Sequence, residues 1–179
     1  QPLPAPSPPS LSTMANAIKV VVMGQGGVGK TAMVLKYTTG EFSEEYLPTI
    51  GDVYTKDVEI AGAPRHITID DTAGQEAYSD LKWEKITTGD GYMLVFSITD
   101  DTTFGMLDAV YAAIREKHPR GAAVPIFLIG TKSDLEDDRA VSRPEIAKRA
   151  KEWNVTPYEC SSKSGHNVKV VFDKLVQAV

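Results

Sequence analysis

The sequence predicts an α/β fold in which a mostly parallel β-sheet carries helices on both faces. Three observations lead to this prediction. Apolar runs of strand length alternate along the chain with segments of helical periodicity. The runs 53–60 and 65–70 are joined by a short turn that contains Gly and Pro, which predicts a hairpin and one antiparallel edge strand. A glycine-rich turn follows the first apolar run, where a strand would pass into a helix.

Six segments have strand character. Continuous apolar runs such as 126–130 are typical of strands buried on both faces, whereas 53–60 alternates with polar residues, as an exposed edge strand does. The predicted strands are 18–23, 53–60, 65–70, 92–98, 126–130 and 155–160.

The helices are indicated by their periodicity and their start signals. Asp100, Asp101 and Thr102 are candidate caps for a helix over 102–117, and Pro144 suits the first turn of the next helix. The predicted helices are 30–37, 102–117, 143–153 and 168–179, with 38–51 a polar loop and 76–88 helical or irregular.

The glycine-rich turn, residues 24–31, reads GQGGVGKT and has the chemistry of a polyphosphate site. Glycines allow positive φ and close approach to a ligand, so that successive N–H groups form an anion nest at a helix N-terminus. Lys30 adds a positive charge for the β- and γ-phosphates, and the Thr31 hydroxyl can ligate Mg²⁺. The turn therefore predicts nucleotide binding.

Three later motifs each follow a predicted strand. They are DTAGQ at 71–75, TKSD at 131–134 and SSK at 161–163. Ligands of open α/β sheets bind at the carboxyl ends of the strands, so we expect all four segments to meet at one site.

Composition agrees with one domain and limits its partners. The chain has 179 residues, of which 42% are hydrophobic, enough for one well-packed core. Its net charge of −5 and its lack of a basic run argue against nucleic-acid binding. A single cysteine, Cys160, excludes an internal disulfide and is expected to be an inert buried thiol.

The first 13 residues differ from the rest. They hold five of the eleven prolines and no charge, so they are expected to form an extension that is disordered or added to the natural chain. Met14 would begin the domain, over 14–179. No signal-peptide pattern is present, and no apolar stretch approaches the ~20 residues that span a bilayer.

The motifs and their order resemble the small GTPases of the Ras superfamily, over roughly residues 17–179. The matching segments are GQGGVGKT (24–31), YLPTI (46–50), DTAGQE (71–76), TKSD (131–134) and SSK (161–163). The pattern most resembles the Ras and Rap branch, although TKSD is typical of the Rho branch. Only 26 residues, 135–160, separate TKSD from SSK, too few for the Rho helical insert. The resemblance implies a P-loop GTPase domain that cycles between GDP and GTP.

The resemblance implies a set of guanine-nucleotide contacts. Asp134 would accept hydrogen bonds from the guanine N1–H and exocyclic amine, the stem of Lys132 would lie over the base, and Phe42 would pack against it. Thr131 replaces the usual Asn, and Ser162 the usual Ala. The implied nucleotide-binding residues are Gly26, Gly27, Val28, Gly29, Lys30, Thr31, Ala32, Phe42, Tyr46, Pro48, Thr49, Gly74, Thr131, Lys132, Asp134, Ser161, Ser162 and Lys163.

The same resemblance implies a Mg²⁺ site and a hydrolytic mechanism. Thr31 would bind the metal in both nucleotide states, Thr49 only with GTP, and Asp71 through a water. Gln75 would orient the attacking water, the Gly74 N–H would sense the γ-phosphate, and Lys30 would also assist catalysis. No arginine lies in 38–51, so a GTPase-activating protein (GAP) would supply one and raise a slow intrinsic rate by roughly 10³–10⁵.

Partner proteins would recognise the nucleotide state through 44–54 and 72–88. An exchange factor (GEF) would speed nucleotide release, and effectors would contact Tyr46, Thr49, Ile50, Asp52 and Tyr54. Gly51 and Leu47 replace acidic residues typical of Ras, and Lys85 replaces an aromatic, so no specific partner follows.

Asp70 stands where an apolar residue is common and would either face solvent or pair with a base. A nucleoside kinase fits poorly, because nothing here supplies a lid or acceptor-binding arginines. A scaffold that no longer hydrolyses GTP is the alternative that Thr131, Asp70 and Gly51 leave open. A cytoplasmic protein is expected, reaching the inner face of the plasma membrane only through a lipidated C-terminal tail that this sequence lacks.

Overall fold

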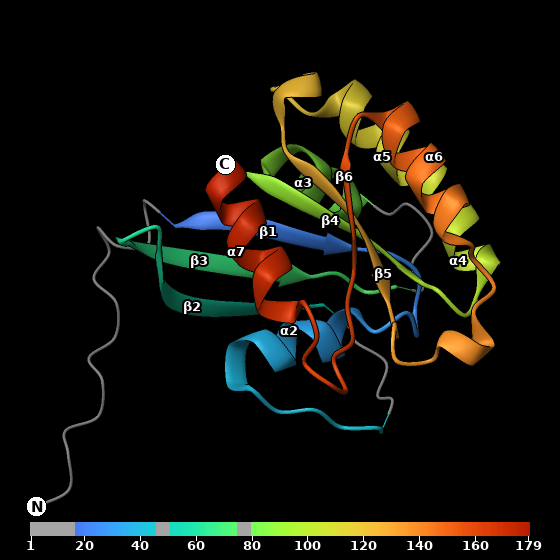
Figure 1. Ribbon diagram of the computed structural model, residues 1–179. Helices are drawn as coiled ribbons and strands as arrows, with labels where there is room; N and C mark the ends of the chain where they lie inside the picture. The colour runs from blue at the N-terminus through green and yellow to red at the C-terminus, as the bar shows by residue number, and fades with distance from the viewer. Residues whose placement is uncertain (1–16, 46–50, 75–79) are drawn as a thin grey trace, which may run out of the picture.

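The computed structural model describes residues 17–45, 51–74 and 80–179, with no description of the side chains at 80–83. Its strands are β1 Ile18–Met23, β2 Asp52–Ile60, β3 Ala63–Asp71, β4 Gly91–Ser97, β5 Ile126–Thr131 and β6 Thr156–Glu159. Its helices are α2 Lys30–Thr39, α3 Asp80–Thr88, α4 Asp101–Gly105, α5 Leu107–Lys117, α6 Arg143–Trp153 and α7 Val168–Ala178, with 3₁₀ turns η1 Gly121–Ala123 and η2 Glu136–Asp138. Figure 1 shows their arrangement.

The strands form one six-stranded sheet in the order β2-β3-β1-β4-β5-β6. β2 pairs antiparallel with β3, and the other neighbours pair in parallel. The predicted mostly parallel sheet with one antiparallel edge strand is therefore confirmed. Every residue of β4 and β5 is buried, because helices cover both faces of these strands.

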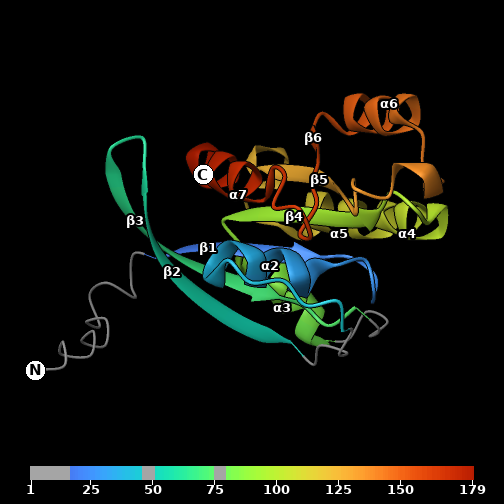
Figure 2. The ribbon, with the colours of Figure 1, turned by 60° about the horizontal axis from the view of Figure 1, so that its bottom comes forward.

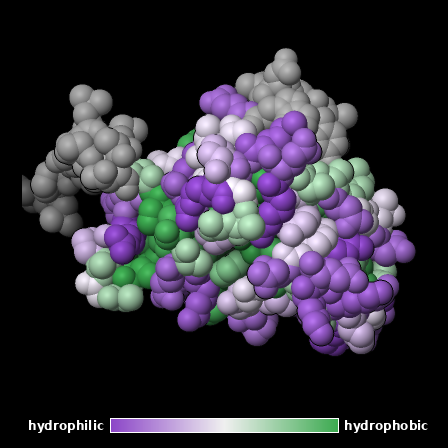
Figure 3. All heavy atoms as spheres, turned by 90° about the horizontal axis from the view of Figure 1, so that it is seen from above, coloured by the Kyte–Doolittle hydropathy of each residue, from purple (hydrophilic) through white to green (hydrophobic). Residues whose placement is uncertain are grey.

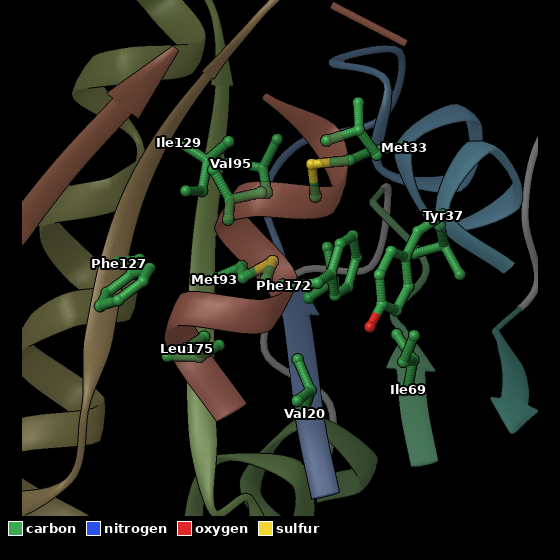
Figure 4. Packing of buried hydrophobic residues seen from close by; sticks show 14 of the residues in the cluster. Val20, Met33, Tyr37, Ile69, Met93, Val95, Phe127, Ile129, Phe172 and Leu175 are labelled. Carbon is green, nitrogen blue, oxygen red and sulfur yellow. The ribbon is translucent and has the colours of Figure 1, made fainter. Parts of the chain in front are cut away.

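Helices α2 and α7 cover one face of the sheet. Val20, Ile69, Met93 and Leu175 belong to the core cluster on this face. The rings of Tyr37 in α2 and Phe172 in α7 stack with centroids 4.2 Å apart at 10°, and Figure 4 shows them side by side. This contact joins the helix after the glycine-rich turn to the last helix.

The other face is covered by α3, α4, α5 and α6. Their buried residues, such as Ile86, Phe104, Ile114 and Ile146, form a second core cluster with β1, β4 and β5. The sheet lies between these two helical layers, with the β2–β3 hairpin projecting beyond them (Figure 2). On the face seen from above, hydrophilic side chains cover much of the surface, with smaller hydrophobic areas between them (Figure 3).

One predicted helix differs from the structure. The segment 102–117 divides into α4 and α5 at Met106, directly after Gly105, a residue of low helix propensity. Met106 keeps right-handed helical angles, so the break is slight. Asp100 caps α4 by accepting from the Thr102 N–H, and Ser142 forms a capping box ahead of Pro144.

Candidate functional site

The glycine-rich turn joins β1 to α2 with the expected backbone geometry. Gly27 and Gly29 have φ of 79° and 98°, angles that favour glycine. Gly29 directly precedes α2 and has no side chain that could cap the helix. The backbone N–H groups at the start of α2 are therefore suited to bind an anion. Lys30 is only 5% exposed, and its Nζ donates to the Gln25 carbonyl oxygen at 3.0 Å.

The two described residues of the predicted metal site are in direct contact. The Thr31 hydroxyl donates to Asp71 Oδ2 at 2.6 Å, from the first turn of α2 to the end of β3. Within the described residues, the buried Oδ1 of Asp71 has no hydrogen-bond partner. Burial raises the pKa of Asp71, opposed by the Thr31 hydrogen bond and the charge of Lys30. Hard oxygen donors with one unpartnered buried carboxylate oxygen fit a Mg²⁺ ion.

Gly74 lies against the phosphate loop. A Cβ placed on Gly74 would stand 2.1 Å from the Gly26 nitrogen, so any larger residue would force the backbones apart. The segment after β3 therefore approaches the glycine-rich turn as the motif spacing predicts.

Thr131 ties the end of β5 to the same turn. The residue is 2% exposed. Its hydroxyl donates to the backbone carbonyl oxygen of Val28 and also lies 3.0 Å from the Phe96 carbonyl oxygen. The residue that replaces Asn thus still reaches the phosphate loop. A hydroxyl carries only one proton, so it satisfies fewer groups than an amide would.

The TKSD and SSK segments are held together at the ends of β5 and β6. The Ser161 hydroxyl donates to Asp134 Oδ1 at 2.7 Å, and the Ser133 N–H donates to the Cys160 carbonyl oxygen at 3.1 Å. Lys132 has φ of 61°, a left-handed conformation uncommon for a residue other than glycine. Ser161 and Ser162 are buried, whereas Asp134 and Lys163 are exposed.

An ion pair links the SSK segment to the loop after α2. Lys163 Nζ lies 2.8 Å from Glu44 Oε1, and both side chains are largely exposed. The hydrogen bond and charge of Lys163 hold the pKa of Glu44 below its usual value. Phe42, two residues earlier, is 37% exposed.

The remaining predicted residues fall into two groups. Ala32 lies in the first turn of α2, and Asp52 and Tyr54 lie on β2, where the Tyr54 hydroxyl is 3.5 Å from Asp52 Oδ2. The second group lies outside the described residues, as does the proline-rich extension over 1–13. This group consists of Tyr46, Pro48, Thr49, Ile50 and Gln75.

Sequence reasoning missed the cluster that supports the TKSD segment. Arg139 donates to Glu136 at 2.9 Å and to Glu159 of β6 at 2.8 Å, and Arg143 also pairs with Glu136. The hydrogen bonds from Arg139 and Arg143 lower the pKa of Glu136 to about 2. The spacing of Glu136 and Arg139 was a sequence signal, but the contact with Glu159 depends on the fold.

Asp70 pairs with a base and is not solvent-facing. It is 4% exposed, and its Oδ1 lies 2.6 Å from Lys85 Nζ. Asp70 and Lys85, which each differ from the residue usual in Ras, therefore form an ion pair with one another.

Comparison with known proteins identifies the chain's relatives. The Ras family model matches residues 19–179. The Ras-related protein O-RAL of Diplobatis ommata is 40% identical over 161 residues, covering 90% of this chain and 78% of that protein. Ras-related protein ralB-B of Xenopus laevis is 41% identical over 165 residues, and Ras-like protein RAS2 of Hydra vulgaris is 40% identical over 162.

The fold and the phosphate site together define a P-loop GTPase domain. With the family match over most of its length, the chain belongs to the Ras family of small GTPases. It is a GTP-binding, GTP-hydrolysing switch in signal transduction that uses Mg²⁺ and acts with regulator and effector proteins. In the part of the chain that the structure describes, every helix is too short or too polar to span a bilayer.

Proposed function

We propose that the guanine nucleotide lies across the carboxyl edge of the sheet, with its phosphates on the glycine-rich turn and its base beside TKSD and SSK. The Thr31–Asp71 contact with its unpartnered buried oxygen is the observation that carries this proposal. The phosphate-binding residues are Gly26, Gly27, Val28, Gly29, Lys30, Thr31 and Ala32. The remaining nucleotide contacts are Phe42, Tyr46, Pro48, Thr49, Gly74, Thr131, Lys132, Asp134, Ser161, Ser162 and Lys163.

Asp134 selects guanine over adenine. Its carboxylate accepts from the guanine N1–H and exocyclic amine, and Ser161 holds it by donating to Oδ1. Adenine has no donor at N1 and would leave the charged group without a partner, which costs several kcal/mol or roughly 10³-fold in affinity.

Thr31 would hold Mg²⁺ in both nucleotide states, Asp71 would hold it through a coordinated water, and Thr49 would join them only with GTP. When bound, the metal neutralises charge on the phosphate oxygens. Lys30 places its ammonium beside the β- and γ-phosphates, from a position that is already buried. This arrangement positions the γ-phosphate for reaction.

Gln75 orients a water molecule for in-line attack on the γ-phosphorus, and the Gly74 N–H donates to a γ-phosphate oxygen. The new P–O bond forms as the bond to the β-phosphate bridging oxygen breaks, which releases GDP and phosphate. Intrinsic hydrolysis is slow, and a GAP supplies an arginine, because 38–51 holds none.

The GTP state is recognised through 44–54 and 72–88, whose contacts with the γ-phosphate are lost after hydrolysis. Effectors contact Tyr46, Thr49, Ile50, Asp52 and Tyr54, and a GEF promotes release of GDP. The exposed edge of β2 supports this role, since an extended peptide can pair with it.

We also propose that residues 14–179 form the GTPase domain and that 1–13 are an extension to it. The protein acts in the cytoplasm, and reaches the inner face of the plasma membrane where a longer chain carries a lipidated tail. Cys160, the single cysteine of this sequence, is fully buried and is no lipid attachment site.

Two variants test these roles. Asp134→Asn is expected to lower GDP affinity about 10³-fold in a fluorescent-nucleotide assay, whereas Asp138→Asn on the exposed turn η2 should leave it unchanged. If Asp134→Asn and Asp138→Asn bound GDP with equal affinity, Asp134 would not contact the base.

Gln75→Leu is expected to slow both intrinsic and GAP-stimulated hydrolysis. If both rates equal those of the wild type, Gln75 does not orient the water.

A further inference from the structure

A buried carboxylate lies between two ammonium groups beneath α3. Asp70 Oδ1 is 2.6 Å from Lys85 Nζ, and Asp70 Oδ2 is 3.9 Å from Lys19 Nζ. The Asp70 side chain is 6% exposed, against 24% for Lys85 and 30% for Lys19. This pair is shielded from solvent far more than a surface pair. Loss of the Lys85 ammonium would leave the buried carboxylate with only the longer contact to Lys19, at 3.9 Å.

The pair lies one residue from the proposed metal ligand. Neighbouring residues of a strand point to opposite faces, so Asp71 reaches Thr31 at the start of α2 while Asp70 reaches Lys85 in α3. The end of β3 thereby connects the proposed Mg²⁺ site on one face with α3 on the other.

Other contacts fix the C-terminal half of α3 further from the nucleotide edge. Lys19 Nζ donates to Thr88 Oγ1 at 2.8 Å. The Tyr92 hydroxyl lies 2.9 Å from the Lys85 carbonyl oxygen and 2.6 Å from that of Ile86, and Ile86 itself is fully buried. In β1, Lys19 pairs with Thr68, two residues before Asp70. Of the contacts that hold α3 on the sheet, the ion pair of the Lys85 side chain with Asp70 is the nearest to the carboxyl end of β3.

Lys85 also meets the start of β2. Gly51 has φ of 111°, and a Cβ placed on it would lie 3.8 Å from Lys85 Nζ and 3.9 Å from the Asp71 carbonyl oxygen. Gly51, Asp70 and Lys85, the three departures from the usual Ras residues, therefore lie close together. They lie where the segments 44–54 and 72–88, both proposed to respond to GTP, join the sheet.

We propose that Lys85 is a positioning residue for hydrolysis: its ion pair with Asp70 latches α3 onto β3. The latch holds residues 84–88, the described end of the 72–88 segment, in one place, so that this end does not have to be ordered when GTP binds. This inference rests on the proposed role of the 72–88 segment.

Lys85→Met tests the latch because it keeps the alkyl stem and removes the charge. Lys169→Met is the matched control, since Lys169 pairs with Asp173 on α7 and is 78% exposed. Amide hydrogen exchange over 84–88 is expected to rise about 3- to 10-fold in Lys85→Met and to stay unchanged in Lys169→Met. This readout requires no nucleotide turnover.

Single-turnover GTP hydrolysis at saturating Mg²⁺ is expected to slow about 3- to 10-fold in Lys85→Met, at a temperature where the variant is folded. The double variant Asp70→Leu/Lys85→Met should be closer to wild type than Lys85→Met alone, because it replaces the poorly compensated buried carboxylate with an apolar side chain, while Lys19 keeps its bond to Thr88 Oγ1. Unchanged exchange in α3 would overturn the latch. Faster exchange with unchanged hydrolysis would overturn its positioning role.

The outcomes are separable from those of the proposed function. If Gln75→Leu had no effect, the role of Gln75 would fail while the exchange measurement still reported on the latch. Additive effects of Asp70→Leu and Lys85→Met on α3 exchange would show that the two residues act independently, and would also overturn the proposal.

Discussion

The Thr131 hydroxyl donates a hydrogen bond to the carbonyl oxygen of Val28, across 103 residues of sequence. It joins the end of β5, which carries the proposed base site, to the turn that carries the proposed phosphate site. The two halves of the nucleotide site are therefore coupled through one buried side chain.

Thr131→Val is expected to weaken this coupling. The substitution keeps the shape of the side chain and leaves the Val28 carbonyl without its donor, which should cost about 1–3 kcal/mol in the free energy of unfolding. GDP affinity should fall about 10-fold in parallel, as measured by denaturant titration and fluorescent GDP binding. Thr131→Ser retains the hydroxyl and should stay close to wild type; a loss as large as that of Thr131→Val would point to packing and away from the hydrogen bond.

Removal of Mg²⁺ is expected to speed GDP release, because Asp71 is proposed to help hold the metal at the phosphates. Chelation should raise the release rate of wild-type protein about 10-fold or more, because a charge-assisted contact contributes about 1.5–3 kcal/mol. Asp71→Asn should release GDP quickly with or without the metal. Asp57→Asn, on the exposed part of β2, provides the control. A chelator effect of equal size in Asp71→Asn and wild type would exclude Asp71 from the metal site.

Glu44→Gln is expected to release GDP about 2- to 5-fold faster than wild type at low salt, since an exposed ion pair stabilises weakly. The difference should vanish near 1 M salt, where such pairs are screened. The pKa of Glu44 is lowered by Lys163, so the pair should persist through neutral pH and weaken only as acid protonates the carboxylate. Glu45→Gln is the neighbouring control, and an equal effect there would indicate general charge and no specific pair.

Cys160 is expected to resist thiol reagents in the folded protein. Burial raises the pKa of this thiol to about 12 from 9.0, so it stays protonated at pH 8. Because the folded pKa is the higher one, the thiol favours folding less as pH rises from about 9 towards 12. Labelling in denaturant should exceed native labelling by at least about 10²-fold, measured by mass spectrometry, since access requires unfolding. Rapid native labelling would contradict the buried position.

Most of the fold could be predicted because its signals are local. The strand runs, the edge character of β2, the cap at Asp100 and the place of Pro144 in the first turn of α6 depend on residues a few positions apart. The break at Met106 was not predicted. The low helix propensity of the single residue Gly105 is a weaker signal than the helical apolar pattern on both sides of it.

The candidate site could be predicted only in part. The motifs identify which residues take part, since glycine conformations, a lysine and a hydroxyl carry the chemistry of phosphate binding wherever they occur in that order. They do not identify the residues that hold these groups in place, such as Arg139 between Glu136 and Glu159.

The sequence by itself determined the class of fold, the phosphate-binding turn and the chemistry expected of Lys30, Thr31, Asp71 and Asp134. Only the tertiary structure decided that Asp70 meets Lys85 and that Glu44 meets Lys163, 119 residues away. The physical reason is that backbone conformation and burial follow from neighbouring residues, whereas the partner of a charged side chain depends on where the packed sheet and helices bring a distant segment.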